Sequence, residues 1–366
     1  MSTAFTSSPL FERVERARRR KHKIRETHIT LAHGSGGRAM HDLVEGVFLE
    51  AFQNPLLEKL EDQAIFDARN FEKLAFTTDS YVVDPIFFPG GDIGSLAVHG
   101  TVNDLAVSGA RPLYLSAGFI IEEGFPIDDL RRVCASMKNA ADEAGVQIVT
   151  GDTKVVQKGG ADKLFINTAG IGVIETKADI SSSRAQVGDK VIVSGTIGDH
   201  GTTIMIARGE LELETDIESD SASLHSLIAD ILDEAESHNA TDAIHSLRDP
   251  TRGGVATTLN EIAMSSNIAI EIREDLIPVR ENVRGACEIL GLDPLYVANE
   301  GKLVAIVSGG IADAVIERMR KHEHGAGACI IGEVKAEPQG IVSMTTGFGG
   351  TRIVDMLAGD QLPRIC

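Results

Sequence analysis

Residues 73–108 read KLAFTTDSYVVDPIFFPGGDIGSLAVHGTVNDLAVS, and this stretch decides the fold. Its first part, 73–83, predicts a β-strand, and residues 94–108 predict an α-helix built of small side chains. Asp79 lies near the end of the predicted strand, and Asp104 lies in the predicted helix. The stretch therefore predicts a strand and a helix that each carry one carboxylate.

On both sides of this stretch the apolar residues repeat with helical or strand periodicity. The N-terminal part predicts helices at 40–51 and 127–145 and strands at 147–150 and 164–173. After a polar, Ser-rich linker at 175–188, the pattern predicts strands at 190–194, 303–308, 328–335 and 341–345, and helices near 222–235, 253–265, 281–290 and 312–321. Because helices and strands intermix in both halves, we expect a mixed α/β (α+β) chain of two lobes, 28–178 and 179–355.

The composition is typical of a protein with two cores. The chain has 366 residues, of which 43% are hydrophobic and 24% are charged. No apolar run approaches the roughly 20 residues of a membrane helix, so we expect no membrane partner. Four scattered cysteines, at 134, 287, 329 and 366, form no disulfide framework, which favours a reducing cytoplasm.

Charge is unevenly distributed. The net charge of −19 disfavours nucleic acid as the main partner of the body of the chain. Residues 1–27 form a basic arm, which we expect to be solvated and disordered, although contact with nucleic acid or anionic lipid is the alternative. Residues 209–236 carry ten acidic side chains and no Lys or Arg, and this pattern predicts a solvated acidic surface.

Carboxylates recur where predicted strands and helices meet loops. Asp79, Asp104, Asp152 and Asp249 all lie at such places. Mg²⁺ takes oxygen ligands and shares its site with substrate phosphates, and the glycine-rich turns at 34–37 and 252–254 allow backbone N–H groups to approach phosphate oxygens. Each Asp taken alone is explained as a turn former or helix cap, but the set together favours nucleotide binding.

Two further charged residues are candidates for chemistry. Lys154, two residues after Asp152, is suited to neutralise a transferred phosphate. Glu300 precedes the predicted strand at 303–308 and is suited to proton transfer, with an ordinary loop acid as the alternative.

The chain ends in Pro363-Arg364-Ile365-Cys366. A thiol at the end of a tail is an attachment point for a small group that must be carried and altered, although a terminal residue without a role is the alternative. Pro363 fixes its own φ and restricts the residue before it, so we expect a partly extended, mobile tail over 356–366. Prenylation is excluded because its signal needs the cysteine fourth from the end.

Nine short motifs together resemble those of one family. They are HGSGG (33–37), TTDSYVVDP (77–85), FFPGGDIG (87–94), GTVNDLAVSGA (100–110), GDTKVV (151–156), SGTIGDHG (194–201), RDPTRGG (248–254), ANEGKL (298–303) and PRIC (363–366). The combination resembles the HypE family, the carbamoyl dehydratases of nickel–iron hydrogenase maturation, from about residue 28 to 366. That family is similar in fold to aminoimidazole ribonucleotide synthetase, selenophosphate synthetase and thiamine-phosphate kinase, which implies two lobes, ATP in a cleft and a homodimer joined through N-terminal sheets.

The resemblance also implies which residues bind ATP and Mg²⁺. Asp79, Asp104 and Asp152 would hold the metal and the nucleotide. The other nucleotide-binding residues would be Ser35, Gly36, Gly37, Asn103 and Asp249.

The catalytic residues that the resemblance implies are Cys366, Lys154 and Glu300. A carbamoyltransferase, HypF, would load a carbamoyl group on Cys366, and ATP would phosphorylate its oxygen. Lys154 would stabilise the developing anion while Glu300 takes a proton from the nitrogen, leaving a thiocyanate. The cyanide would pass to iron on a HypC–HypD complex.

Other functions remain open from the sequence. A selenophosphate synthetase would have a reactive Cys near the glycine-rich turn, and a thiamine-phosphate kinase would need no terminal thiol. A non-enzymatic carrier whose cysteine docks a metal or sulfur donor is the alternative from another class, and it would show no ATP turnover.

Overall fold

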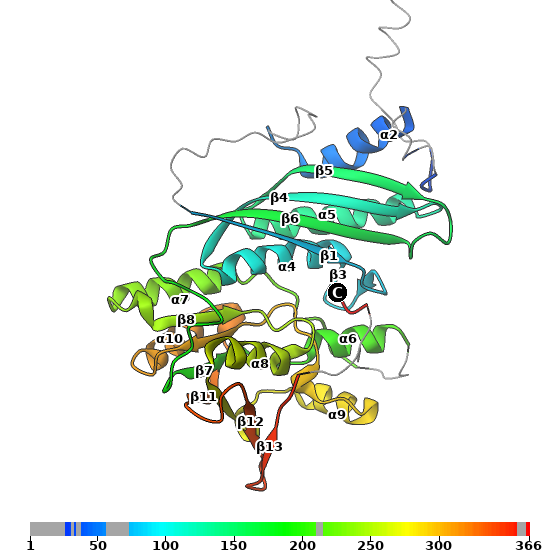
Figure 1. Ribbon diagram of the computed structural model, residues 1–366. Coiled ribbons are helices and arrows are strands. Elements are labelled where there is room, and N and C mark those ends of the chain that lie inside the picture. The colour runs from blue at the N-terminus through cyan, green and yellow to red at the C-terminus, as the bar shows by residue number, and fades with distance from the viewer. Residues whose placement is uncertain (1–25, 31–32, 34–37, 56–72, 210–214, 357–363) are drawn as a thin grey trace, which may run out of the picture.

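The computed structural model describes residues 26–30, 33, 38–55, 73–209, 215–356 and 364–366. The chain folds into two lobes, each built on its own sheet (Figure 1). This confirms the expected two-lobed α+β fold. The basic arm and the turn at Gly34–Gly37 lie outside the described residues. No helix in the described ranges is long and apolar enough to cross a membrane.

The N-terminal lobe is a four-stranded sheet with two long helices on one face. The strand order is β1-β6-β4-β5, with β4 and β5 parallel and the other neighbours antiparallel. Its elements are α2 (Arg38–Leu43), the π-helix η2 (Val44–Leu49), α3 (Glu50–Phe52), β1 (Leu74–Tyr81), β2 (Phe87–Phe88), β3 (Gly91–Asp92), α4 (Ile93–Val107), β4 (Ala110–Glu122), α5 (Ile127–Glu143), β5 (Gln147–Val156) and β6 (Leu164–Ile174).

The C-terminal lobe is a seven-stranded mixed sheet surrounded by helices, with strand order β13-β12-β9-β11-β7-β10-β8. Its elements are β7 (Lys190–Val193), α6 (Asp199–Ala207), α7 (His225–Ser237), η4 (Thr241–Ala243), β8 (Ile244–Arg248), α8 (Gly254–Ser266), β9 (Ala269–Arg273), η5 (Glu274–Leu276), α9 (Glu281–Leu290), η6 (Pro294–Tyr296), β10 (Val304–Val307), α10 (Ala312–Met319), η7 (Glu323–Gly325), β11 (Cys329–Lys335), β12 (Val342–Thr345) and β13 (Thr351–Ile353).

Helix α4 lies between the N-terminal sheet and the C-terminal lobe, as Figure 1 shows. It begins with a capping box, in which Asp92 accepts hydrogen bonds from the backbone of Gly94 and Ser95. Twelve of its fifteen residues are buried, because small side chains allow both lobes to approach it. The predicted helix of small residues is thus the element that joins the two lobes.

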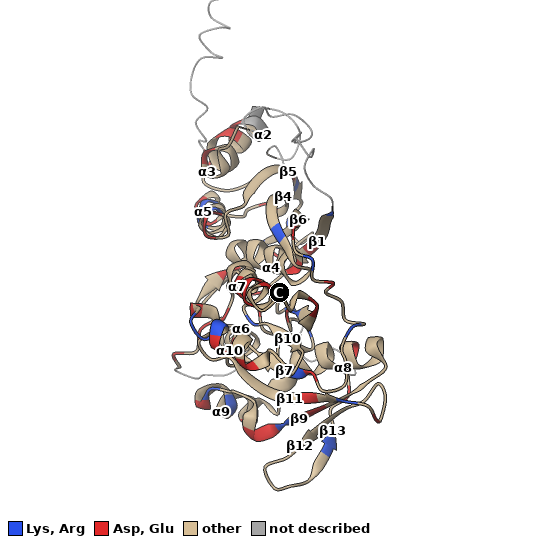
Figure 2. Ribbon diagram, turned by 90° about the vertical axis from the view of Figure 1, so that its left-hand side faces the viewer, with Lys and Arg blue, Asp and Glu red and all other residues tan. Residues whose placement is uncertain are grey.

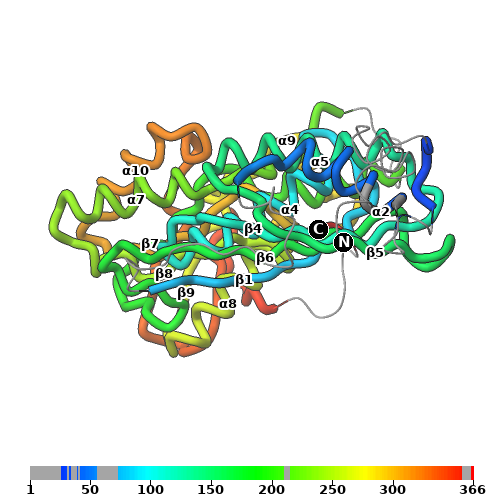
Figure 3. Tube along the Cα trace, turned by 90° about the horizontal axis from the view of Figure 1, so that it is seen from above, coloured from blue at the N-terminus to red at the C-terminus, as the bar shows by residue number. Residues whose placement is uncertain are grey.

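The second face of the N-terminal sheet is open in the part of the chain that the structure describes. Helices α4 and α5 lie on one side of it, and Figure 2 shows no helix over the other side among the drawn ribbons. Large apolar side chains are exposed on that open face or at its end, with Leu74 at 52%, Phe76 at 70% and Ile120 at 44%. Strands β1 and β5 form the two edges of the sheet, and Figure 3 shows them alongside β4 and β6.

Close packing of α4 on α5 gives a test of this architecture. A Cβ at Gly94 would lie 2.4 Å from the backbone oxygen of Val133, so we expect Gly94→Ala to destabilise the protein by about 1–3 kcal/mol through overpacking. The matched control is Gly285→Ala in α9, where nothing lies within 4 Å of the added Cβ and helix propensity favours Ala. Urea unfolding measures both, and equal midpoints for the two variants would contradict the packing.

Candidate active site

Three of the predicted carboxylates converge where the lobes meet. Asp79 lies on β1, Asp104 on α4, and Asp249 directly after β8. Burial, together with the charges of Asp104 and Asp79, raises the pKa of Asp249 to about 7. Burial and the charge of Asp79 also raise the pKa of Asp104, whose Oδ2 accepts a hydrogen bond from Thr77 at 2.8 Å. Carboxylates that repel one another in this way suit a divalent cation.

These three side chains do not form a complete metal site by themselves. In the part of the chain that the structure describes, no three His, Cys, Asp or Glu side chains are arranged to hold a metal ion. The group therefore fits a cation that also takes ligands from elsewhere, such as phosphate oxygens or another subunit.

Glu300 is buried beside the same carboxylates, with 3% of its surface exposed. Its Oε1 has no hydrogen-bond partner among the described residues. Burial raises the pKa of Glu300 well above its ordinary value, and the charges of Asp249, Asp220 and Asp79 act in the same direction. A buried carboxyl group with a raised pKa is a candidate for proton exchange with a bound substrate.

Four hydrogen bonds join the loop that carries Glu300, helix α4 and the segment 220–224. The Asn103 amide on α4 donates to the carbonyl oxygens of Ala222 at 3.0 Å and Glu300 at 3.3 Å, and its Oδ1 accepts from Leu224 N–H at 2.7 Å. The backbone N–H of Glu300 donates to Asp220 Oδ1 at 3.1 Å. The Asn103 amide thus ties α4 to both segments, and its expected contact with nucleotide stays a prediction.

Asp220 corrects the prediction that residues 209–236 form a solvated surface. Its side chain is buried and forms an ion pair with Lys302 at 3.1 Å. The segment around it crosses so close to Gly301 that a Cβ there would lie 1.7 Å from the Asp220 carbonyl oxygen. Acidic composition alone could not distinguish this inward carboxylate from the exposed ones.

The chain terminus lies inside this site. Figures 1 and 2 place the C-terminus at the junction of the lobes. Burial, the nearby Glu300 and Asp79 raise the pKa of the Cys366 thiol to about 12, and Arg252 opposes this rise. The structure therefore brings the predicted pair Cys366 and Glu300 together and shows the tail seated in the interior.

Two residues that the sequence did not single out hold the tail. His200 lies 2.8 Å from the Ile365 carbonyl oxygen through Nε2 and 2.8 Å from Ser219 Oγ through Nδ1. Because a carbonyl can only accept, Nε2 carries the proton, and burial lowers the pKa of His200 so that the ring stays neutral. Arg208 donates to the carbonyl oxygens of Asp84 and Arg364. His200 lies in the motif SGTIGDHG (194–201), and membership of that motif is the sequence feature that could have pointed to it.

Asp152 and Lys154 do not join the site within one chain. They pair with each other at 2.7 Å on β5, the edge opposite to β1, and both are exposed. The strand register places Asp152 opposite Gly118, on the open face of the sheet, whereas Asp79 stands opposite buried Thr168 on the helix-covered face. The predicted metal trio of Asp79, Asp104 and Asp152 is thus not gathered by a single chain.

The remaining predicted nucleotide contacts, Ser35, Gly36 and Gly37, lie outside the described residues. The nearest described part of their loop is His33, which is buried and accepts a hydrogen bond from Thr30 N–H at 3.0 Å.

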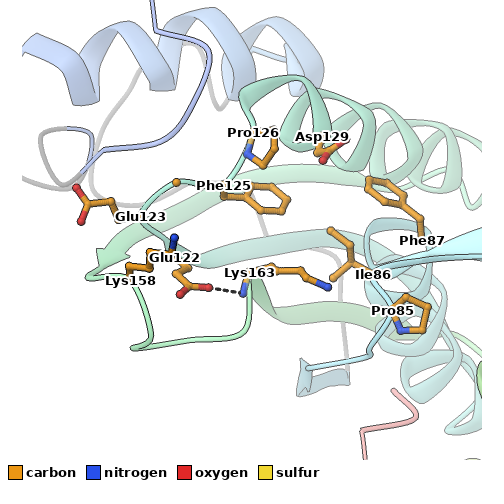
Figure 4. A pocket seen from close by; sticks show the side chains of 11 residues that line it. Pro85, Ile86, Phe87, Glu122, Glu123, Phe125, Pro126, Asp129, Lys158 and Lys163 are labelled. Carbon is orange, nitrogen blue, oxygen red and sulfur yellow. Dashed lines mark hydrogen bonds between the residues drawn. The ribbon is translucent and has the colours of Figure 1, made fainter. Parts of the chain in front are cut away.

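A hollow of about 480 Å³ lies beside the tail (Figure 4). Pro85, Ile86, Phe87 and Phe125 give it apolar walls, and Figure 4 shows Lys163 extending along it from the end of β6. Lys163 also pairs with Asp84 at 3.4 Å, on the segment that binds the tail. The hollow is thus lined by Pro85–Phe87, directly after the residues Val82 and Asp84 that bind the tail.

Comparison with known proteins agrees with this architecture. Family models described as AIR synthase related protein match the N-terminal domain over residues 60–174 and the C-terminal domain over residues 186–345. The fold and the two-lobed site thus define an AIR synthase-related protein.

Comparison with individual proteins identifies the family within this class. A protein named carbamoyl dehydratase HypE from Bradyrhizobium diazoefficiens is 56% identical over 351 residues, which is 96% of this chain and 100% of that protein. A crystal structure of the hydrogenase maturation protein HypE with ATP has 53% identity and a TM-score of 0.87, covering 92% of this chain and 99% of that one. A HypE–HypF complex has 50% identity and a TM-score of 0.74, covering 86% and 99%. The chain belongs to the carbamoyl dehydratase HypE family.

The raised pKa of Asp249 gives a pH-dependent prediction. The folded protein binds this proton more tightly than the unfolded chain, whose Asp pKa is about 4, so stability falls as pH rises through the window up to about 7. Asp249→Asn removes the charge, so we expect it to raise the melting temperature more at pH 8 than at pH 5, where the folded protein still keeps this proton.

Thermal unfolding at both pH values measures this difference. Asp142→Asn, at an exposed carboxylate on α5, is the control and should give the wild-type profile. Destabilisation of the Asp249→Asn variant at pH 8 would show that the carboxylate is compensated in the folded chain.

Proposed function

We propose that the chain dehydrates a carbamoyl group carried on Cys366, at the expense of ATP. The observation that carries this proposal is the seated tail, which holds the thiol beside the buried carboxyl of Glu300. In the reaction, the S-carbamoyl group R–S–CO–NH₂ and ATP give R–S–C≡N, ADP, phosphate and a proton. The amide oxygen leaves on phosphate, because phosphorylation turns a poor leaving group into a good one.

Glu300 takes a proton from the nitrogen as the C–O bond breaks. A carboxyl group whose pKa is raised by burial is a better base for this step than a solvated one. The surrounding interior also keeps water from the activated carbamoyl group.

Asp79, Asp104 and Asp249 are the residues of one chain that would hold Mg²⁺, which offsets the charge on the transferred phosphoryl group when bound. Repulsion among their carboxylates supports this role. We assign the nucleotide to the same junction of the lobes. The boundary between the two lobes lies near residue 178.

The chain acts as a homodimer in which the partner completes the site. Strands β1 and β5 are open edges, and Phe76 and Ile120 expose apolar surface at the open face of their sheet. A two-fold partner that covers this face and pairs its β5 with β1 closes the two sheets into one barrel. Its β5 then runs beside β1, directly before the segment that binds the tail, and we assign Lys154 and Asp152 of the partner subunit to the site across that seam, where the lysine stabilises the developing anion.

The reaction needs one partner that supplies the carbamoyl group and one that accepts the cyanide. A carbamoyltransferase of the HypF kind loads the thiol, and an iron-carrying HypC–HypD complex takes the cyanide. The structural likeness to a HypE–HypF complex supports the first partner. Four free cysteines suit the reducing cytoplasm in which we place these steps.

The mass of the C-terminal peptide tests the reaction. After incubation with ATP, carbamoyl phosphate and the transferase, we expect the wild-type peptide to carry a carbamoyl adduct that has lost one water. Glu300→Gln should accumulate the undehydrated adduct, with dehydration slowed about 10²–10⁴-fold. Cys366→Ser should carry neither adduct, while it keeps its melting temperature and ATP binding. A carbamoyl adduct that never dehydrates in wild type would refute the proposal, as would absence of ATP turnover.

Mixing two inactive variants tests the shared site. If Lys154 serves the partner's thiol, a mixed dimer of Lys154→Ala and Glu300→Gln contains one site with both native residues. We expect about a quarter of wild-type dehydration from a statistical mixture after subunit exchange. Each variant alone should be inactive, and an inactive mixture would place Lys154 in its own chain's site.

A further inference from the structure

The last three residues contact the protein as a bound peptide does. The N–H of Val82 donates to a main-chain oxygen of Cys366 at 3.0 Å, and the N–H of Asp84 donates to the Arg364 carbonyl at 3.3 Å. These two bonds run the tail antiparallel to residues 82–84, directly after β1, without forming a regular strand. Peptide recognition commonly uses main-chain bonds of this kind for affinity and side-chain pockets for specificity.

Each of the three side chains has its own place in the groove. Arg364 donates through Nε to the Val82 carbonyl at 3.0 Å, pairs with Asp162, and lies 6.0 Å from the centre of the Phe165 ring. Ile365 is 3% exposed and belongs to the apolar core that includes Ile204 and Met205.

The third residue, Cys366, is half-buried with its thiol near Glu300. The groove thus contacts the side chains of Arg364, Ile365 and Cys366 in turn.

The protein is built to receive this backbone. Neutral, buried His200 is oriented by Ser219 and donates to the Ile365 carbonyl, and Arg208 joins the carbonyl oxygens of Arg364 and Asp84. Arg364 has a φ of 54°, a left-handed conformation that is unfavourable for a residue with a Cβ. The contacts of the groove therefore impose the shape of the tail, and recognition resides in residues 364–366.

We propose that this groove is a peptide-binding site that also accepts the Arg-Ile-Cys terminus of a second copy of the chain. The inference rests on the proposed function of Cys366. The chain that links the tail to its own groove raises the local concentration of the tail but adds no contacts to it. The effective concentration from such a link is on the order of 1 mM, so the terminus of another chain binds when it is supplied at about that concentration. One copy can then dehydrate the carbamoyl group carried by another.

The test uses full-length Ile365→Asp, whose own tail cannot seat because the apolar socket rejects a carboxylate. The probe is the free peptide Leu-Pro-Arg-Ile-Cys, S-carbamoylated on its cysteine. We expect this variant to leave its own Cys366 unconverted, and to convert the free peptide to the thiocyanate with ATP. The same peptide with Asp in place of Ile should not be converted.

Binding is measured separately from activity. Fluorescence anisotropy of an N-terminally labelled Leu-Pro-Arg-Ile-Cys peptide should show saturable binding to the Ile365→Asp chain. Unlabelled Leu-Pro-Arg-Ile-Cys should displace it, whereas the Asp-containing peptide should not. If Ile365→Asp loses its thermal transition, Arg364→Glu replaces it, because that side chain lies near the surface and its charge reversal removes the pair with Asp162.

A second arm identifies the source of the terminus. Glu300→Gln protein, carbamoylated on its native tail, is mixed with Ile365→Asp protein, and the thiocyanate is expected on the tail of the Glu300→Gln chain. Conversion of the free peptide without conversion in this mixture would overturn the second copy as the occupant. Neither binding nor conversion of the peptide would overturn the groove as a separable site.

Wild-type protein carbamoylated on its own Cys366 runs in parallel. Its failure to form thiocyanate would refute the proposed function. Its success beside an inert peptide would refute only the trans inference.

Discussion

The whole site depends on one carboxyl group, that of Glu300, which is buried in the seam between the lobes without a hydrogen-bond partner for Oε1 in the described chain. Leaving a polar atom in this condition costs about 1–3 kcal/mol, so the surrounding structure must hold it in place. The Glu300 backbone is held from both lobes: Asn103 of the N-terminal lobe donates to its carbonyl oxygen, and Asp220 of the C-terminal lobe accepts from its N–H. The carboxyl group therefore acquires its raised pKa only when both lobes are packed on α4.

The tail depends on the same seam. Its main chain pairs with Val82 and Asp84 of the N-terminal lobe, while His200 and Arg208 of the C-terminal lobe bind its carbonyl oxygens. The thiol and the carboxyl group that acts on it are thus positioned by contacts from both lobes. A relative shift of the lobes would displace the Cys366 thiol and the Glu300 carboxyl together. The position of the substrate is therefore coupled to the position of the base.

Local sequence patterns predicted much of this arrangement, and long-range contacts explain what they missed. Strand β1 and helix α4 follow from apolar periodicity. The search for carboxylates near element ends singled out Asp79, Asp104 and Asp249, which converge, together with Asp152, which lies elsewhere in the chain. The prediction missed strand β4 altogether, although it lies at the centre of the N-terminal sheet. Motif spacing could not show which side chain faces which way.

The face of the sheet on which a residue lies was one such unknown. Asp152 and Asp79 fall on opposite faces because side chains alternate along a strand, and that depends on a register spacing does not reveal. Asn103 illustrates the same limit, since its partners Ala222 and Leu224 are more than a hundred residues away. Asp220 was hidden among acidic neighbours for a similar reason.

The antiparallel course of the tail has a mechanical consequence. Its attachment to the rest of the chain is at Arg364, and Cys366 lies at the far end of the paired segment. A protein that grips the upstream segment therefore acts on the contacts of Arg364 first, and the sulfur of Cys366 leaves last.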